Sequence, residues 1–161
     1  MRRRLMMLEK TGSEGLPDGY TTLEYIQSSG TQYIDTGRKL TQDSDITIDF
    51  QIVDRTNIDA GIFGSRESST KNNLTLFQNY SGASDIKCDF SEYLKHRVAV
   101  SKTFNRIKIQ MNKNGVWVND ILKKSWSDVA DFETPTNGLI FDVGNNNWTG
   151  NKAVMRLYSY T

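Results

Sequence analysis

The sequence predicts an all-β fold, a two-sheet antiparallel jelly-roll sandwich. Three observations predict it: short runs of alternating apolar and polar residues recur, polar turn residues separate them, and no segment keeps helical periodicity over three turns. Each such strand has one apolar face, and packing two sheets together buries these faces from water. A chain of 161 residues is long enough for one domain of this kind.

The clearest alternation lies at residues 45–53, where four apolar side chains point to one side of the predicted strand. These are Ile46, Ile48, Phe50 and Ile52. Further strands are expected at residues 23–27, 32–36, 60–65, 74–78, 86–90, 97–101, 106–111, 116–119, 139–143 and 154–160. One helical turn is expected near Ser127, whose side chain would cap it.

One hairpin is expected from local sequence alone. Asn114-Gly115 separates the alternating runs 106–111 and 116–119. Both residue types tolerate the positive φ angles of a type I′ turn, which matches the twist of the two strands that it joins. The sequence therefore predicts a two-residue type I′ hairpin at this point.

The charge and hydropathy patterns argue against two kinds of partner. The net charge is +1, and the basic residues are scattered apart from Arg2-Arg3-Arg4, so no nucleic acid is expected as a partner. No apolar run approaches the roughly 18 residues of a membrane span. The apolar stretch after the basic start is shorter than the roughly seven residues of a signal peptide core, so the protein is expected to be made without one.

Two parts of the chain are distinguished by composition. Residues 1–15 end in a polar, glycine-containing stretch and are expected to form a flexible tail or a docking segment. Residues 16–161 are expected to form the sandwich domain. The sequence stops directly after a predicted strand, so we expect either that an edge strand is missing or that this is the front part of a longer polypeptide.

Residues 20–37, YTTLEYIQSSGTQYIDTG, resemble the opening of concanavalin A-like (LamG-like) domains, which are common in phage and prophage structural proteins. Residues 46–53, 61–66 and 155–160 fit the same pattern. The resemblance implies a sandwich of one concave and one convex sheet, with surface or carbohydrate recognition in some relatives and a structural role in others. It also implies a virion protein made in the cytoplasm of a bacterial host.

The chemistry-bearing residues do not form a catalytic pattern. Glucanases of this fold need closely spaced carboxylates on one strand, because alternate residues of a strand face the same cleft. The six glutamates do not show this spacing; they are Glu9, Glu14, Glu24, Glu67, Glu92 and Glu133. His96 is the single histidine and Cys88 the single cysteine, and Cys88 is expected to be a small buried side chain. We therefore predict a protein that is not an enzyme.

Candidate ligand-binding residues come from loops that combine aromatic and amide side chains. Trp148 follows Asn145 and Asn147 in one such loop, Tyr80 lies in another, and Arg66 is expected nearby. A flat ring can stack on a sugar face while amide groups bind hydroxyls. The alternative for Trp148 is a ring that caps the core under a loop.

The other two tryptophans are weaker candidates for ligand contact. Trp117 lies between two valines in the predicted hairpin, so it is either on the exposed face of the strand or, if the strand bulges, in the core. Trp126 lies in the connection that follows. Neither has the flanking amide-rich loop found at Trp148.

Calcium is the one cofactor that the sequence suggests, and otherwise no cofactor is expected. Asp54 and Asp59 flank Asn57 in one loop, and Asp142 precedes residues 145–147 in another. Carboxylate and amide oxygens are ligands that calcium accepts. The alternative is ordinary turn chemistry, because Asp and Asn favour turns.

Two functions remain open on the sequence. The first is a non-enzymatic virion-associated structural or decoration protein with a lectin-like domain, whose partners are other virion proteins or a second copy of itself. The alternative is a carbohydrate-binding module that recognises cell-surface glycans during host adhesion. The fold alone does not choose between them.

Overall fold

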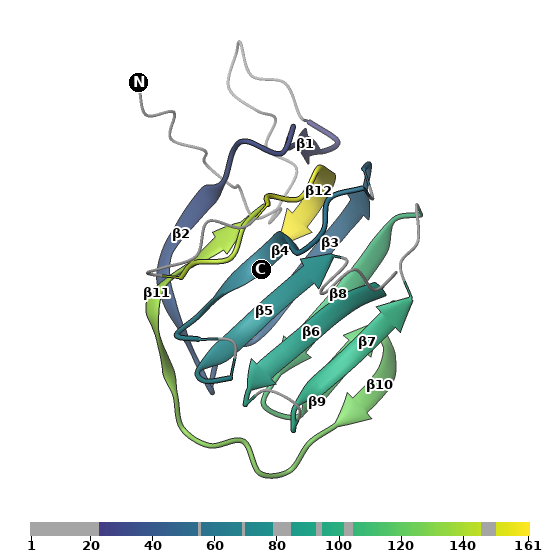
Figure 1. Cartoon of the computed structure of the whole chain (residues 1–161). Coiled ribbons are helices and arrows are strands. Elements are labelled where there is room, and N and C mark those ends of the chain that lie inside the picture. Colours follow the sequence, from purple (N-terminus) through teal and green to yellow (C-terminus); the bar gives the residue numbers. More distant parts are fainter. Residues whose placement is uncertain are drawn as a thin grey trace, which may run out of the picture.

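A computed structural model describes residues 23–54, 56–68, 70–78, 85–92, 95–101, 105–145 and 151–161. In these residues, twelve strands form two antiparallel six-stranded sheets that pack face to face (Figure 1). This confirms the predicted all-β, two-sheet antiparallel sandwich. A helix that could cross a membrane is not found among the described residues.

We name the two layers sheet A and sheet B. Sheet A contains, in spatial order, β1 (Ile26–Gln27), β12 (Met155–Tyr160), β3 (Ile46–Ile52), β8 (Ile107–Asn112), β9 (Gly115–Val118) and β10 (Ile121–Ser125). Sheet B contains β2 (Ile34–Thr41), β11 (Glu133–Ile140), β4 (Ala60–Arg66), β5 (Asn73–Gln78), β6 (Asp85–Ser91) and β7 (Arg97–Ser101). The strands from β4 to β7 are therefore sequential neighbours in sheet B, and those from β8 to β10 are sequential neighbours in sheet A. The remaining strands, β1, β2, β3, β11 and β12, alternate between the two sheets along the chain.

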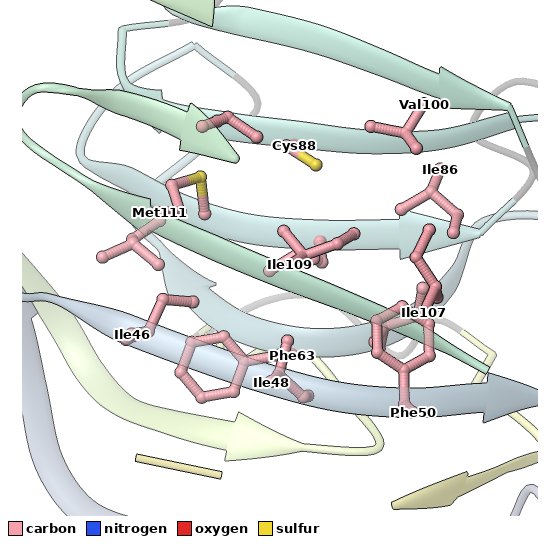
Figure 2. Packing of buried hydrophobic residues seen from close by; sticks show 14 of the residues in the cluster. Ile46, Ile48, Phe50, Phe63, Ile86, Cys88, Val100, Ile107, Ile109 and Met111 are labelled. Carbon is pink, nitrogen blue, oxygen red and sulfur yellow. The ribbon is translucent and has the colours of Figure 1, made fainter. Parts of the chain in front are cut away.

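The core lies between the two sheets, as the alternation in the sequence predicts. The apolar face of β3 includes Ile48 and Phe50, both completely buried, and β8 adds Ile109. Figure 2 shows these side chains in the same cluster as Ile86 and Cys88 from sheet B. Burial of side chains of this size is the main stabilising contribution to such a fold, at roughly 1.5–3 kcal/mol each.

The hairpin between β8 and β9 is confirmed, but its predicted turn is wrong. Asn112 pairs with Gly115, so the turn residues are Lys113 and Asn114, and Asn114 does not adopt a positive φ. The backbone N–H of Asn114 instead donates to Oδ1 of Asn112 over 2.9 Å. This side-chain contact stabilises the turn without left-handed residues.

The left-handed two-residue turn lies in the next hairpin. Val118 pairs with Ile121, and the turn residues Asn119 and Asp120 have φ angles of 49° and 66°. Both angles are positive, as a type I′ turn requires, and Asn and Asp tolerate them best among residues with a side chain. This turn leads into β10, which the sequence does not predict because Ile121–Ser125 lacks an apolar–polar alternation.

Every strand expected from the sequence overlaps an observed one, but β11 is misplaced. It spans Glu133–Ile140 instead of residues 139–143, and it contains Pro135 and two register shifts against β2. Proline and bulges interrupt the alternation that identifies a strand. The strand ends at Ile140 because Phe141 turns away with a φ of 70°. The expected helical turn at Ser127 is also wrong, since this residue lies in a bend without helical structure.

Candidate functional site

The side of sheet B that faces away from the core carries a row of buried polar side chains. Leu74 and Leu76 of β5 belong to the core, so the alternate residues Asn73, Thr75 and Phe77 point to the opposite side. The strand register places Asp89 beside Thr75 and Arg66 beside Asn73. We call these five residues the sheet B site: Arg66, Asn73, Thr75, Phe77 and Asp89.

All five residues are buried, although they lie on an outer face. Their exposed fractions run from 0% for Thr75 and Phe77 to 7% for Arg66. Part of the cover is the chain after β11: a Cβ atom on Gly61 would lie 2.7 Å from the backbone of Asp142 and Val143. Glycine is required there because only its missing side chain lets this segment pack onto the strand. Val143 is itself buried outside the main core, as Phe77 is.

Charged and aromatic groups of the site contact one another. The guanidinium of Arg66 lies over the ring of Phe77, 4.8 Å from its centroid. Arg97 of β7 donates two hydrogen bonds to the carboxylate of Asp89, the longer at 2.6 Å. Bidentate pairs of this kind are geometrically specific and hold both side chains in one orientation. The site is therefore preorganised at its Arg66 and Asp89 ends.

Two polar atoms in the middle of the row have no hydrogen-bond partner among the described residues. They are Nδ2 of Asn73 and Oγ1 of Thr75. An unpaired buried donor or hydroxyl costs about 1–3 kcal/mol, so most buried polar groups in proteins are paired with protein or with water. Asn73 and Thr75 therefore carry hydrogen-bonding capacity that the described residues do not use.

The structure brings two of the predicted ligand-binding residues to one end of the site. The backbone N–H of Arg66 donates to the carbonyl of Gly144 over 2.9 Å, and Asn145 follows directly. Trp148, Asn147 and Tyr80 lie outside the described residues. The sequence did not single out Asn73 and Thr75, because polar residues alternating in a strand usually face solvent.

The three carboxylates proposed for calcium have separate surroundings. Asp54 accepts hydrogen bonds from the backbone and the hydroxyl of Thr56, which lower the pKa of its carboxyl. Asp142 forms an ion pair with Lys152 at 2.9 Å, and Asp59 occupies a turn with a φ of 52°. In the described ranges, no three acidic, histidine or cysteine side chains gather as a metal site. Calcium binding stays a prediction.

Cys88 and His96 occupy structural positions. Cys88 is fully buried in the core, as predicted, and burial raises the pKa of its thiol far above the ordinary value. His96 is 1% exposed and lies edge-on to Trp126, with ring centroids 5.7 Å apart. Its Nε2 lies 3.5 Å from the carboxylate of Asp128, beyond good hydrogen-bond geometry.

Fold and site together define a class: a two-sheet antiparallel β-sandwich with a buried polar face on one sheet. Comparison with protein-family models gives no match to this sequence, and none of the curated proteins matches it. The site geometry is therefore the basis for assigning a function.

Proposed function

We propose that this protein is a non-enzymatic carbohydrate-binding protein that uses the sheet B site. The observation that carries the proposal is the pair of buried, unpartnered polar atoms, Nδ2 of Asn73 and Oγ1 of Thr75. An amide N–H donates and a hydroxyl both donates and accepts, which is the combination that sugar hydroxyls satisfy. The adjacent Arg66 and Phe77 add a cationic donor and an aromatic ring.

Access to the site is through its charged residues. Arg66 is 7% exposed and the Arg97 side chain 15% exposed, so part of each of these residues reaches the surface next to the buried row. A glycan bound here would contact the exposed parts of these residues and reach the buried Asn73 and Thr75 through a bridging water. Buried water commonly bonds polar groups that would otherwise lack a partner.

Replacing Thr75 by valine tests the proposal through stability and binding together. The change removes an unpartnered hydroxyl but keeps the shape of the side chain, so we expect the free energy of unfolding to rise by about 1 kcal/mol. We also expect about a tenfold loss of affinity for the glycan that the wild type selects on a mixed array of neutral and acidic glycans. Urea denaturation and the array measure the two effects.

Thr134→Val is the matched control. Thr134 is equally buried, but its Oγ1 accepts from the backbone of Leu40 and donates to the carbonyl of Thr136, both over 2.9 Å. Its replacement should therefore lower the free energy of unfolding by about 1–3 kcal/mol. Equal destabilisation by Thr75→Val, or wild-type protein that binds no glycan on the array, would contradict the proposed function.

A second candidate function is a structural or decoration role in a phage or prophage virion, with other virion proteins or a second copy as partners. Its support is the resemblance at residues 20–37, whose polar residues build a specific loop. The backbone N–H of Ser29 donates to Oε1 of Gln32 over 2.9 Å, and that of Gly30 donates to Oγ of Ser28 over 3.0 Å. The residues that carry the resemblance therefore include some that hold this loop in its conformation.

If the protein has a role in the virion, it should stay bound to phage particles. Tagged protein, expressed in a strain that releases phage, is expected to co-sediment with intact particles in a density gradient. Tagged protein that stays at the top of the gradient while particles sediment would contradict the role. A carbohydrate-binding protein outside a virion would give that result and still bind the glycan array.

A further inference from the structure

The outer face of sheet A carries a second group of side chains suited to a ligand, on the opposite side of the sandwich from the sheet B site. We propose that Trp117, Gln110 and Asp45 form a separate binding site for a neutral oligosaccharide. This inference rests on the proposed carbohydrate-binding function but uses none of the residues of the sheet B site.

The strand register places Trp117 on the outer face. Val116 and Val118 are buried in the core, and Trp117 between them is partly exposed. Trp117 pairs with Gln110 of β8 on one side and with Leu122 of β10 on the other. Residues directly opposite on neighbouring strands point to the same face, so the indole ring lies beside the Gln110 side chain on an open sheet surface.

A polar network next to the ring is already ordered. Gln110 donates from Nε2 to one oxygen of Asp45 over 3.2 Å, and Asn112 donates from Nδ2 to the other over 3.1 Å. Asn112 is held in turn by the backbone N–H of Asn114. A carboxylate has about four acceptor positions, and these bonds use two of them. Asp45 is exposed, and its bonds to described residues leave acceptor capacity for a ligand.

These groups define the chemistry of the ligand. The apolar face of a sugar ring stacks on an indole, and two neighbouring hydroxyls donate to a fixed carboxylate. The negative charge of Asp45 would repel an acidic sugar at close range. Asp45 immediately precedes β3, Trp117 lies on β9, and β8 lies between these two strands. The two residues are therefore separated by two strand spacings of about 4.8 Å each and by an offset of two residues along the strands. A chain of neutral sugars, rather than one ring, suits this separation.

Two sites on opposite faces would allow one molecule to bridge two glycan chains. The strands of sheet A and sheet B form separate layers, with the core between them (Figure 1). A bivalent molecule binds a surface with many glycans more tightly than either site alone would. The second site therefore also suits attachment to a polysaccharide surface.

The test uses the full chain and four neutral hexasaccharides, namely those of cellulose, laminarin, chitin and starch. At least one is expected to shift the Trp117 indole N–H resonance in a 15N NMR titration, assigned from the Trp117→Phe spectrum. Trp117→Ala and Asp45→Ala should each weaken that binding about tenfold. Trp117→Tyr, which keeps a ring, should retain most of it, and hexagalacturonate should not shift the resonance.

Leu122→Ala is the control on the same face, because Leu122 is beside Trp117 but carries no polar group for a sugar. It should leave the affinity unchanged. If a hexasaccharide binds and Thr75→Val weakens it while Trp117→Ala does not, the second site is wrong and the sheet B site stands. If Trp117→Ala weakens the binding and Thr75→Val does not, the second site stands and the sheet B site is wrong. No shift with any of the four sugars overturns the inference.

Discussion

Replacing Phe90 by alanine is expected to lower the free energy of unfolding by about 3–5 kcal/mol. Phe90 is fully buried, and its ring stacks on Trp126 at 5.7 Å and lies edge-on to Phe132 at 5.6 Å. Trp126 and Phe132 come from the segment that connects the two sheets, after β10 and before β11. Removing the central ring leaves a cavity among buried side chains, and the surrounding structure is expected to close it only in part.

Urea denaturation followed by tryptophan fluorescence and by far-UV circular dichroism measures this effect. Leu23→Ala is the control, because Leu23 is 69% exposed and its truncation should change the free energy of unfolding by less than about 0.5 kcal/mol. A loss below 1 kcal/mol for Phe90→Ala would mean that the three rings do not form the packed cluster described here.

Gly64→Ala is expected to lower the free energy of unfolding by about 3 kcal/mol or more. Gly64 has a φ of 129°, and a Cβ atom there would lie 2.1 Å from the carbonyl oxygen of Leu74 and 2.7 Å from Cα of Thr75. Both contacts are with the backbone of β5, which cannot rotate away as a side chain can. The clash therefore adds to the conformational cost of a side chain at positive φ. The change should also weaken glycan binding, because it displaces Thr75.

Gly37→Ala separates the two contributions. Gly37 also has a positive φ, 72°, but nothing lies within 4 Å of the Cβ position. Alanine at this position should lower the free energy of unfolding only by the cost of a side chain at positive φ, about 1–2 kcal/mol. Chemical denaturation of both variants under the same conditions gives the comparison, and equal losses would show that the β4–β5 contact is not tight.

The sequence was a good guide where a strand has one apolar face and an uninterrupted register. The alternation of β3 predicted its buried residues correctly, and the valines around Trp117 placed β9 correctly. It failed for β11, where Pro135 and register shifts break the period, and for β10, which has no apolar stripe. Periodicity reports burial of one face only, so an edge strand without such a face has no signal.

The binding site was less predictable than the fold. Arg66 and Asn145 were identified as candidates, and the structure places them at one end of the sheet B site. Asn73 and Thr75 were missed because polar residues alternating along a strand predict a solvent-facing side. Trp117 was considered, but its orientation depended on whether its strand bulges, which only the pairing with Gln110 decides.

The sequence by itself therefore determined that the protein is built of antiparallel strands and which side chains of β3 face the core. These properties follow from local alternation and turn residues, which act over a few positions. Only the tertiary structure decided that the sheet B site is buried while Trp117 on the outer face of sheet A is partly exposed. The reason is physical: burial of a polar face depends on distant segments such as Asp142 and Val143 packing onto Gly61, and no local pattern encodes that contact.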